Sequence, residues 1–156
     1  MFVKILTIDP SGNGITGWAF INERGEIEFG EFQATQWLEH LDYLIKLVRE
    51  RKPQQIVYEN TNYIHKRNSA GLGLFKLLGG IETFRYLFAT PVAFLPVSQV
   101  KQFYTRLYNN KEQIPLLTYK IGRGNGWSYQ GKRLSLHQVD AFLIYYIYKN
   151  NGNKKK

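Results

Sequence analysis

Three short β-rich segments follow one another at the start of the chain, separated only by turn residues. Residues 2–8 are largely apolar, as expected of a strand that is buried on both faces. Asn13-Gly14 can supply the positive φ values of a tight hairpin turn, and residues 15–21 form a second apolar segment. Residues 26–32 alternate polar and apolar side chains. The chain is therefore predicted to open as a three-stranded antiparallel meander.

Helical and strand-like segments alternate after this meander. The spacing of apolar residues, with Thr35, Ser69 and Ser98 as N-caps, predicts helices within residues 35–51, 69–88, 98–107 and 135–149, and a weaker one near 111–119. Short apolar strands are predicted at 54–58 and 91–95, and a basic, glycine-rich loop at 122–133. Helices that return the chain to parallel strands imply an α/β fold with a mixed sheet flanked by helices.

The chain length and residue usage limit the classes of protein that fit. The 156 residues are enough for one domain with a substantial core, and we expect that domain over residues 1–149, with a basic disordered tail over 150–156. The absence of Cys excludes disulfide frameworks, thiolate metal sites and cysteine nucleophiles. We see no signal-peptide pattern and no apolar run of about 18 residues. The expected location is the cytoplasm of a bacterial or phage-infected cell, with no membrane partner.

The net charge of the chain is strongly positive. Its 21 Lys and Arg exceed its 12 Asp and Glu, which gives +9 at neutral pH. A surplus of this size on one small domain favours a polyanionic partner such as nucleic acid or an acidic membrane surface. The plain alternative is that the basic surface only aids solubility.

Two carboxylates stand at the carboxyl ends of predicted strands. Asp9 and Glu59 each end an apolar segment, and the first and fourth strands, as parallel neighbours, would place their Cα atoms about 5 Å apart. Two carboxylates this close stay ionised only with a cation between them, and hard oxygen ligands favour Mg²⁺ or Mn²⁺ over zinc. His137 and Asp140 lie on one face of the last helix and would complete the site.

Such a cluster suits phosphodiester hydrolysis. Two metal ions about 3.5–4 Å apart can activate the attacking water and stabilise the leaving oxygen without a serine or cysteine nucleophile. The ordinary structural interpretation is that Asp9-Pro10 is turn chemistry, Glu59 simply ends a strand, and His137 with Asp140 caps a helix start.

Three motifs resemble one known family. Ile8-Asp9-Pro-Ser-Gly-Asn-Gly-Ile-Thr-Gly-Trp-Ala19, Ile56-Val-Tyr-Glu59 and His137-Gln-Val-Asp140-Ala141 are similar to the RuvC-type Holliday junction resolvases of the RNase H-like superfamily. The order and separation of the motifs match over about residues 2–148. The first motif alone also resembles actin-like ATPases, but those need two such domains, which 156 residues cannot hold.

The resemblance implies a five-stranded RNase H-like sheet, a homodimer, and Mg²⁺-dependent (Mn²⁺ substituting) paired nicking of four-way DNA junctions. This activity would make the chain a crossover junction endodeoxyribonuclease of recombination, repair or phage DNA processing. Asp9, Glu59 and Asp140 match the family's metal-binding carboxylates. His137 falls where members have Asp or His. Because imidazole binds Mg²⁺ poorly, we expect His137 to act on the attacking water or on a phosphate.

The resemblance also implies DNA contacts. Lys101 and Lys111 resemble family lysines that would contact phosphates, and Tyr63 lies near the position of an aromatic that stacks at the junction centre. The predicted loop at 121–133 is longer than in the bacterial members. This difference leaves the substrate range open, because phage-type members act more broadly on branched DNA. Its basic residues Arg123, Lys132 and Arg133 suit backbone contacts, and the alternative is a solvated loop with Trp127 folded back onto the domain.

The dimer inference rests on the predicted helix at 69–88, whose glycines would allow close approach of a second copy. Two other functions remain open at this point. One is an RNase H-like nuclease that acts on RNA or RNA–DNA hybrids, of the ribosomal-RNA processing type. The other is a non-catalytic protein that binds DNA junctions.

Overall fold

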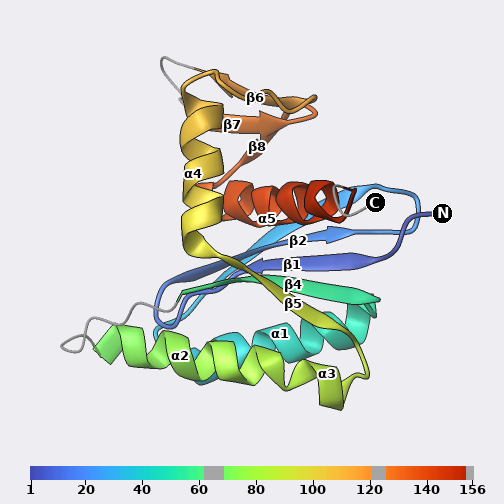
Figure 1. Ribbon diagram of the computed structural model, residues 1–156. Coiled ribbons are helices and arrows are strands. Elements are labelled where there is room, and N and C mark those ends of the chain that lie inside the picture. Colours follow the sequence, from blue (N-terminus) through green and yellow to red (C-terminus); the bar gives the residue numbers. More distant parts are fainter. Residues whose placement is uncertain (62–68, 121–125, 154–156) are drawn as a thin grey trace.

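The computed structural model describes residues 1–61, 69–120 and 126–153, and its centre is a mixed five-stranded sheet (Figure 1). Strands β1 (Ile5–Asp9), β2 (Ile15–Ile21) and β3 (Ile27–Gln33) form the antiparallel meander. Strands β4 (Gln55–Asn60) and β5 (Val92–Pro96) run parallel to β1, which gives the order β3-β2-β1-β4-β5. The predicted fold class is confirmed.

Helices cover both faces of this sheet (Figure 1). On one face lie α1 (Trp37–Arg51), α2 (Ser69–Glu82) and the short α3 (Phe84–Leu87), which pack on strand residues such as Leu6 and Ile8. On the other face α5 (Leu136–Asn153) packs on a second cluster that includes Val57, while α4 (Val97–Tyr108) leads away from β5. The alternation of side chains along each strand therefore divides the core into two clusters.

A second sheet stands beyond α5, at the far end of α4 (Figure 1). It consists of β6 (Leu117–Lys120), β7 (Gly126–Tyr129) and β8 (Lys132–Leu134). The predicted weak helix at 111–119 is therefore wrong where β6 begins, and the predicted loop at 122–133 is wrong over β7 and β8. Gln130 and Gly131 have φ values of 49° and 78°, as a two-residue hairpin turn requires. The inward residues of the sheet, Leu117, Trp127 and Leu134, are buried against the α5 side of the core.

Several helix ends differ from those predicted. Helix α1 begins after Gln36 rather than Thr35, with the Glu39 carboxylate accepting the Gln36 N–H at 3.2 Å. Helix α4 begins directly after Pro96, and Thr83 separates α2 from α3, which were predicted as one helix. Helix α5 runs to Asn153, so residues 150–153 are helical and do not belong to the predicted disordered tail. In the part of the chain that the structure describes, no helix combines the length and apolarity needed to cross a membrane.

Candidate functional site

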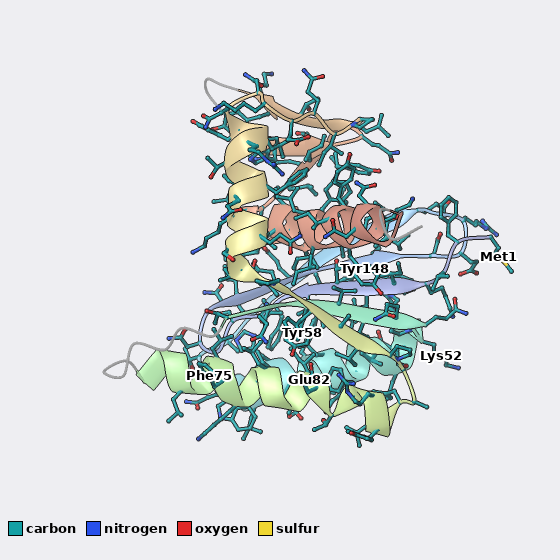
Figure 2. The ribbon with its side chains drawn as sticks, viewed as in Figure 1. Met1, Lys52, Tyr58, Phe75, Glu82 and Tyr148 are labelled. Atoms are coloured by element: carbon teal, nitrogen blue, oxygen red, sulfur yellow. The ribbon has the colours of Figure 1, made fainter. Side chains whose placement is uncertain are left out.

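Asp9 and Glu59 lie on neighbouring strands at one edge of the sheet. Strand β1 pairs with β4 in parallel, with Ile8 opposite Tyr58, so the two carboxylate residues follow side by side. Tyr58 points toward α2, where its hydroxyl donates to the Glu82 carboxylate at 2.5 Å (Figure 2). Because side chains alternate along a strand, Glu59 projects to the opposite face, the one that α5 covers.

Helix α5 brings its first turn directly onto this edge. The His137 Nδ1 lies 3.3 Å from the Asp9 Oδ2, and Asp140 follows one turn later on the same helix. The Thr7 hydroxyl donates to the Ala141 carbonyl at 2.7 Å and so fixes α5 on β1. The predicted convergence of Asp9 with His137 is thus present in the structure.

The start of α5 is capped by other residues. The Ser135 N–H donates to the Gln138 Oε1 at 3.0 Å, and the Ser135 Oγ accepts the Gln138 N–H at 3.2 Å, which is a capping box. His137 and Asp140 therefore do not serve as the helix cap that the ordinary structural interpretation of these residues required.

Two glycines that the motif analysis treated only as turn or strand residues allow this close packing. A Cβ on Gly17 of β2 would lie 2.3 Å from the His137 carbonyl oxygen, and one on Gly12 would lie 2.4 Å from the Leu74 nitrogen of α2. Neither neighbour is a flexible side chain that could move aside. The sequence signal for such contacts is no more than a glycine beside an acidic motif, which is why the spacing did not identify them.

The acidic side chains act on one another electrostatically. Burial, followed by the charges of Asp9 and Asp140, raises the pKa of Glu59 to about 8, against the opposing effect of Lys101. Burial and the Asp9 charge raise the pKa of Asp140 to about 7, against His137 and Lys101. The pKa of Asp9 is raised by burial, although the hydrogen bond from His137 opposes this. The pKa of His137 is raised chiefly by that same hydrogen bond.

The cluster has the donor chemistry of a site for a hard cation. It offers three carboxylates and one imidazole, and its carboxylates repel one another in a buried setting, a repulsion that a cation would relieve. Within residues 1–61, 69–120 and 126–153, however, no three acidic or histidine side chains converge closely enough to hold a metal ion as they stand. The Asp9 carboxylate is engaged by His137 instead.

The raised pKa of Glu59 predicts how the free energy of unfolding depends on pH. A carboxyl whose pKa rises on folding, as that of Glu59 does from 4.5 to about 8, stabilises the fold below pH 4.5, and this contribution is lost as the pH rises through 8. We therefore expect Glu59→Gln to be more stable than the wild type at pH 8.5 in EDTA, by on the order of 2 kcal/mol, with the advantage shrinking toward pH 5.

Urea unfolding at the two pH values measures this difference in the free energy of unfolding. Glu23→Gln, at an exposed position in the turn between β2 and β3, is the matched control and should leave the pH dependence unchanged. If Glu59→Gln were less stable than the wild type at pH 8.5, the ionised Glu59 carboxylate would not destabilise the fold, and the prediction would be wrong.

The predicted DNA-contact residues fall into three groups. The positive charge of Lys101 on α4 opposes the raised pKa values of Glu59 and Asp140, so it lies within electrostatic reach of the cluster. Lys111, Lys132 and Arg133 are exposed beyond it, after the end of α4 and on β8. Tyr63 and Arg123 lie outside the described residues. Trp127 is only 3% exposed and donates to the Tyr104 hydroxyl at 3.2 Å, so it has a core role, as the alternative interpretation held.

The basic charge of the chain is concentrated in one region. Residues 97–134, which include α4 and the small sheet, contain seven of the basic residues but only one acidic residue, Glu112, and so contribute +6 of the net +9. We call this region the basic lobe. Its described elements, α4 and the small sheet, stand off the central sheet on the side that carries α5 (Figure 1).

The sequence matches no protein-family model and no curated protein. Among solved structures, the chain is similar to RuvC of T. thermophilus in complex with a Holliday junction substrate, with 13% identity and a TM-score of 0.63 over 97% of both chains. A second Thermus thermophilus RuvC structure matches with 15% identity and a TM-score of 0.59, over 96% of this chain and 97% of that one.

A viral protein has the same architecture. The fowlpox virus Holliday junction resolvase shares 13% identity with a TM-score of 0.52, over 96% of this chain and 99% of its own. At sequence identities this low, the structural similarity shows the fold alone. Over nearly its whole length this chain has the RNase H-like fold of the RuvC-type resolvases.

Proposed function

We propose that the chain is a divalent-metal-dependent endonuclease that resolves four-way DNA junctions by paired, symmetric nicks. The observation that carries the proposal is the partly buried set of Asp9, Glu59, Asp140 and His137, with Asp9 and His137 in contact, at the carboxyl edge of the sheet in a fold shared with junction resolvases. A protein that only bound DNA would gain nothing from clustered negative charge near phosphates.

The residues of the cluster have distinct proposed roles. Asp9, Glu59 and Asp140 would hold Mg²⁺ or Mn²⁺, which when bound supplies positive charge at the scissile phosphate and makes the attacking water more acidic. His137 donates its Nδ1–H to Asp9, so Nε2 is the atom at which it would take up or release a proton. Lys101 would bind a phosphate oxygen beside the cluster.

DNA binding would come mainly from the basic lobe. Lys111, Lys132 and Arg133 are exposed there, and the lobe carries almost no compensating acid. Tyr63 and Arg123 remain sequence-based candidates for stacking and phosphate contact. Contacts of this kind follow the shape and charge of the DNA rather than its bases, which suits a substrate defined by its branching.

The paired cuts require two active sites. A homodimer with a twofold axis would place two such sites on symmetric strands of the junction. Helix α2 is the proposed contact, because Leu72 on it is 56% exposed. Two of the α2 glycines, Gly73 and Gly80, face Gly12 and Leu41 of the same protomer.

The decisive experiment offers a labelled four-way junction, a linear duplex and an RNA–DNA hybrid to the purified protein, with Mg²⁺ or with EDTA. Paired symmetric nicks in the junction alone, dependent on Mg²⁺, are expected. Cutting of the hybrid would favour a nuclease of the RNA-processing type. Tight junction binding without cutting in Mg²⁺ or Mn²⁺ would contradict the enzyme and favour a binding protein.

Neutralising the basic lobe should weaken binding without altering the chemistry. We expect the double variant Lys111→Ala/Lys132→Ala to bind the junction about tenfold more weakly and to lower the slope of log affinity against log salt by about two. The cleavage rate at saturating protein should stay near that of the wild type. The control is Lys46→Ala/Arg49→Ala, which removes the same charge from exposed positions on α1. Equal losses in both variants would contradict a specific role for the lobe.

A further inference from the structure

His40 in the first turn of α1 is completely buried, and both of its ring nitrogens have partners. Its Nδ1 lies 2.8 Å from the Thr16 Oγ1 of β2, and its Nε2 lies 2.9 Å from the Ala34 carbonyl oxygen. The ring also packs edge-on against Phe32. A fully enclosed histidine with two defined partners has one orientation and one set of hydrogen bonds.

The carbonyl partner fixes the direction of one of these hydrogen bonds. A carbonyl oxygen can only accept, so the His40 Nε2 carries the proton and donates it to Ala34. With a single proton on the ring, Nδ1 accepts from the Thr16 hydroxyl at 2.8 Å, a shorter contact than the 3.4 Å from this hydroxyl to the Ser11 carbonyl oxygen. The Thr16 oxygen in turn accepts the Ser11 N–H at 3.1 Å. A directed chain therefore runs from Ser11 through Thr16 and His40 to Ala34.

This chain begins in the turn that follows Asp9. Ser11 is the second residue after Asp9, and its own Oγ accepts the Gly14 N–H at 2.9 Å, which closes the turn between β1 and β2. Both side chains of the relay, Thr16 and His40, are fully buried. The backbone next to Asp9 is thus tied to α1 by groups that no solvent molecule can replace.

We propose that Thr16 and His40 are positioning residues: they hold the turn after β1 in the conformation that directs the Asp9 carboxylate at His137. The catalytic consequence rests on the proposed function, because it assumes that Asp9 takes part in cleavage. Reacting groups must be placed within about 0.5 Å, and a hydrogen bond two residues away is close enough to set that placement.

The test compares isosteric substitutions at two buried threonines. Thr16→Val removes the hydroxyl from the relay, and Thr16→Ser keeps it. Thr90→Val makes the same change at a buried threonine whose hydroxyl bonds the Pro53 and Phe88 carbonyls, remote from the site.

In single-turnover cleavage we expect Thr16→Val to be slower by about 10- to 100-fold, with junction affinity in EDTA unchanged within about twofold. Thr16→Ser should recover the rate to within about threefold of the wild type, and Thr90→Val should cleave at the wild-type rate. A merely structural role predicts that both valine variants affect cleavage alike, and that result would overturn the proposal.

Nuclear magnetic resonance tests the relay without reference to cleavage. The ¹⁵N shifts of His40 should report protonation at Nε2, and Thr16→Val should speed hydrogen exchange at the Ser11 amide and shift the His137 ring signals. Thr90→Val should do neither. A proton on Nδ1, or unchanged Ser11 and His137 signals in Thr16→Val, would overturn the proposal. A wild-type protein that fails to cut DNA while these signals respond would instead refute the nuclease assignment alone.

Discussion

Asp9→Asn is expected to abolish cleavage of a four-way junction, by at least about 10³-fold, while junction binding stays equal or becomes tighter. Asparagine keeps the shape of the side chain but removes the charge that would hold the cation and that pairs with His137. Binding does not suffer, because one negative charge fewer faces the DNA phosphates. Single-turnover cleavage with Mg²⁺ and an electrophoretic shift assay in EDTA measure the two effects separately.

The control for this variant is Asp42→Asn on the exposed side of α1, which removes an equal charge from the face that α5 does not cover. It should leave both measurements unchanged. Wild-type cleavage by Asp9→Asn would show that the acidic cluster is not the site of chemistry, even if the junction remained the preferred ligand.

Gly17→Ala should have the second largest effect, although the substitution adds a single methyl group. The new Cβ would lie 2.3 Å from the His137 carbonyl oxygen and 2.7 Å from the His137 Cβ, so the first turn of α5 has to move away from β2. We expect cleavage to fall by about 10²-fold and the free energy of unfolding by about 2 kcal/mol.

Urea unfolding and single-turnover cleavage measure these two losses. Gly79→Ala in α2 is the control for the stability measurement, because nothing lies within 4 Å of a Cβ there and a helical alanine stabilises by up to about 1 kcal/mol. If Gly17→Ala matched the wild type in both stability and cleavage, the close packing of α5 on β2 would be refuted.

The parts of the structure that were predictable are those with local signals. Asp9 and Glu59 each stand at the carboxyl end of an apolar segment, which predicts that both lie at the same edge of the sheet. The three-residue spacing of His137 and Asp140 predicts that they share a helix face. Once the topology places β1 beside β4, these signals predict that the four residues share one edge of the sheet, and the structure shows the contact between Asp9 and His137.

The small sheet was missed because its strands are too short to show their period. Strands β6, β7 and β8 have four, four and three residues, and an alternation over so few positions does not separate a strand from a helix or a loop. The buried inward residues, such as Trp127, become recognisable only when α4 and α5 supply the surface that covers them.

The relay of His40 was beyond sequence reasoning for a different reason. Its partners are 24 residues away at Thr16 and 6 residues away at Ala34, and no local pattern relates a histidine in a helix to a threonine in a preceding strand. The same holds for Gly17, whose need to be glycine comes from a helix 120 residues later in the chain.

The contact of Gly12 with α2 has a mechanical consequence. At Gly12 the turn after Asp9 packs directly against the main chain of α2, since a Cβ there would come within 2.4 Å of the Leu74 nitrogen. Main chain against main chain has no rotamers that can absorb a displacement, and packed interiors transmit strain. The turn and α2 are therefore expected to move as one unit. A displacement of α2 at Leu74 would therefore also displace the turn that follows Asp9.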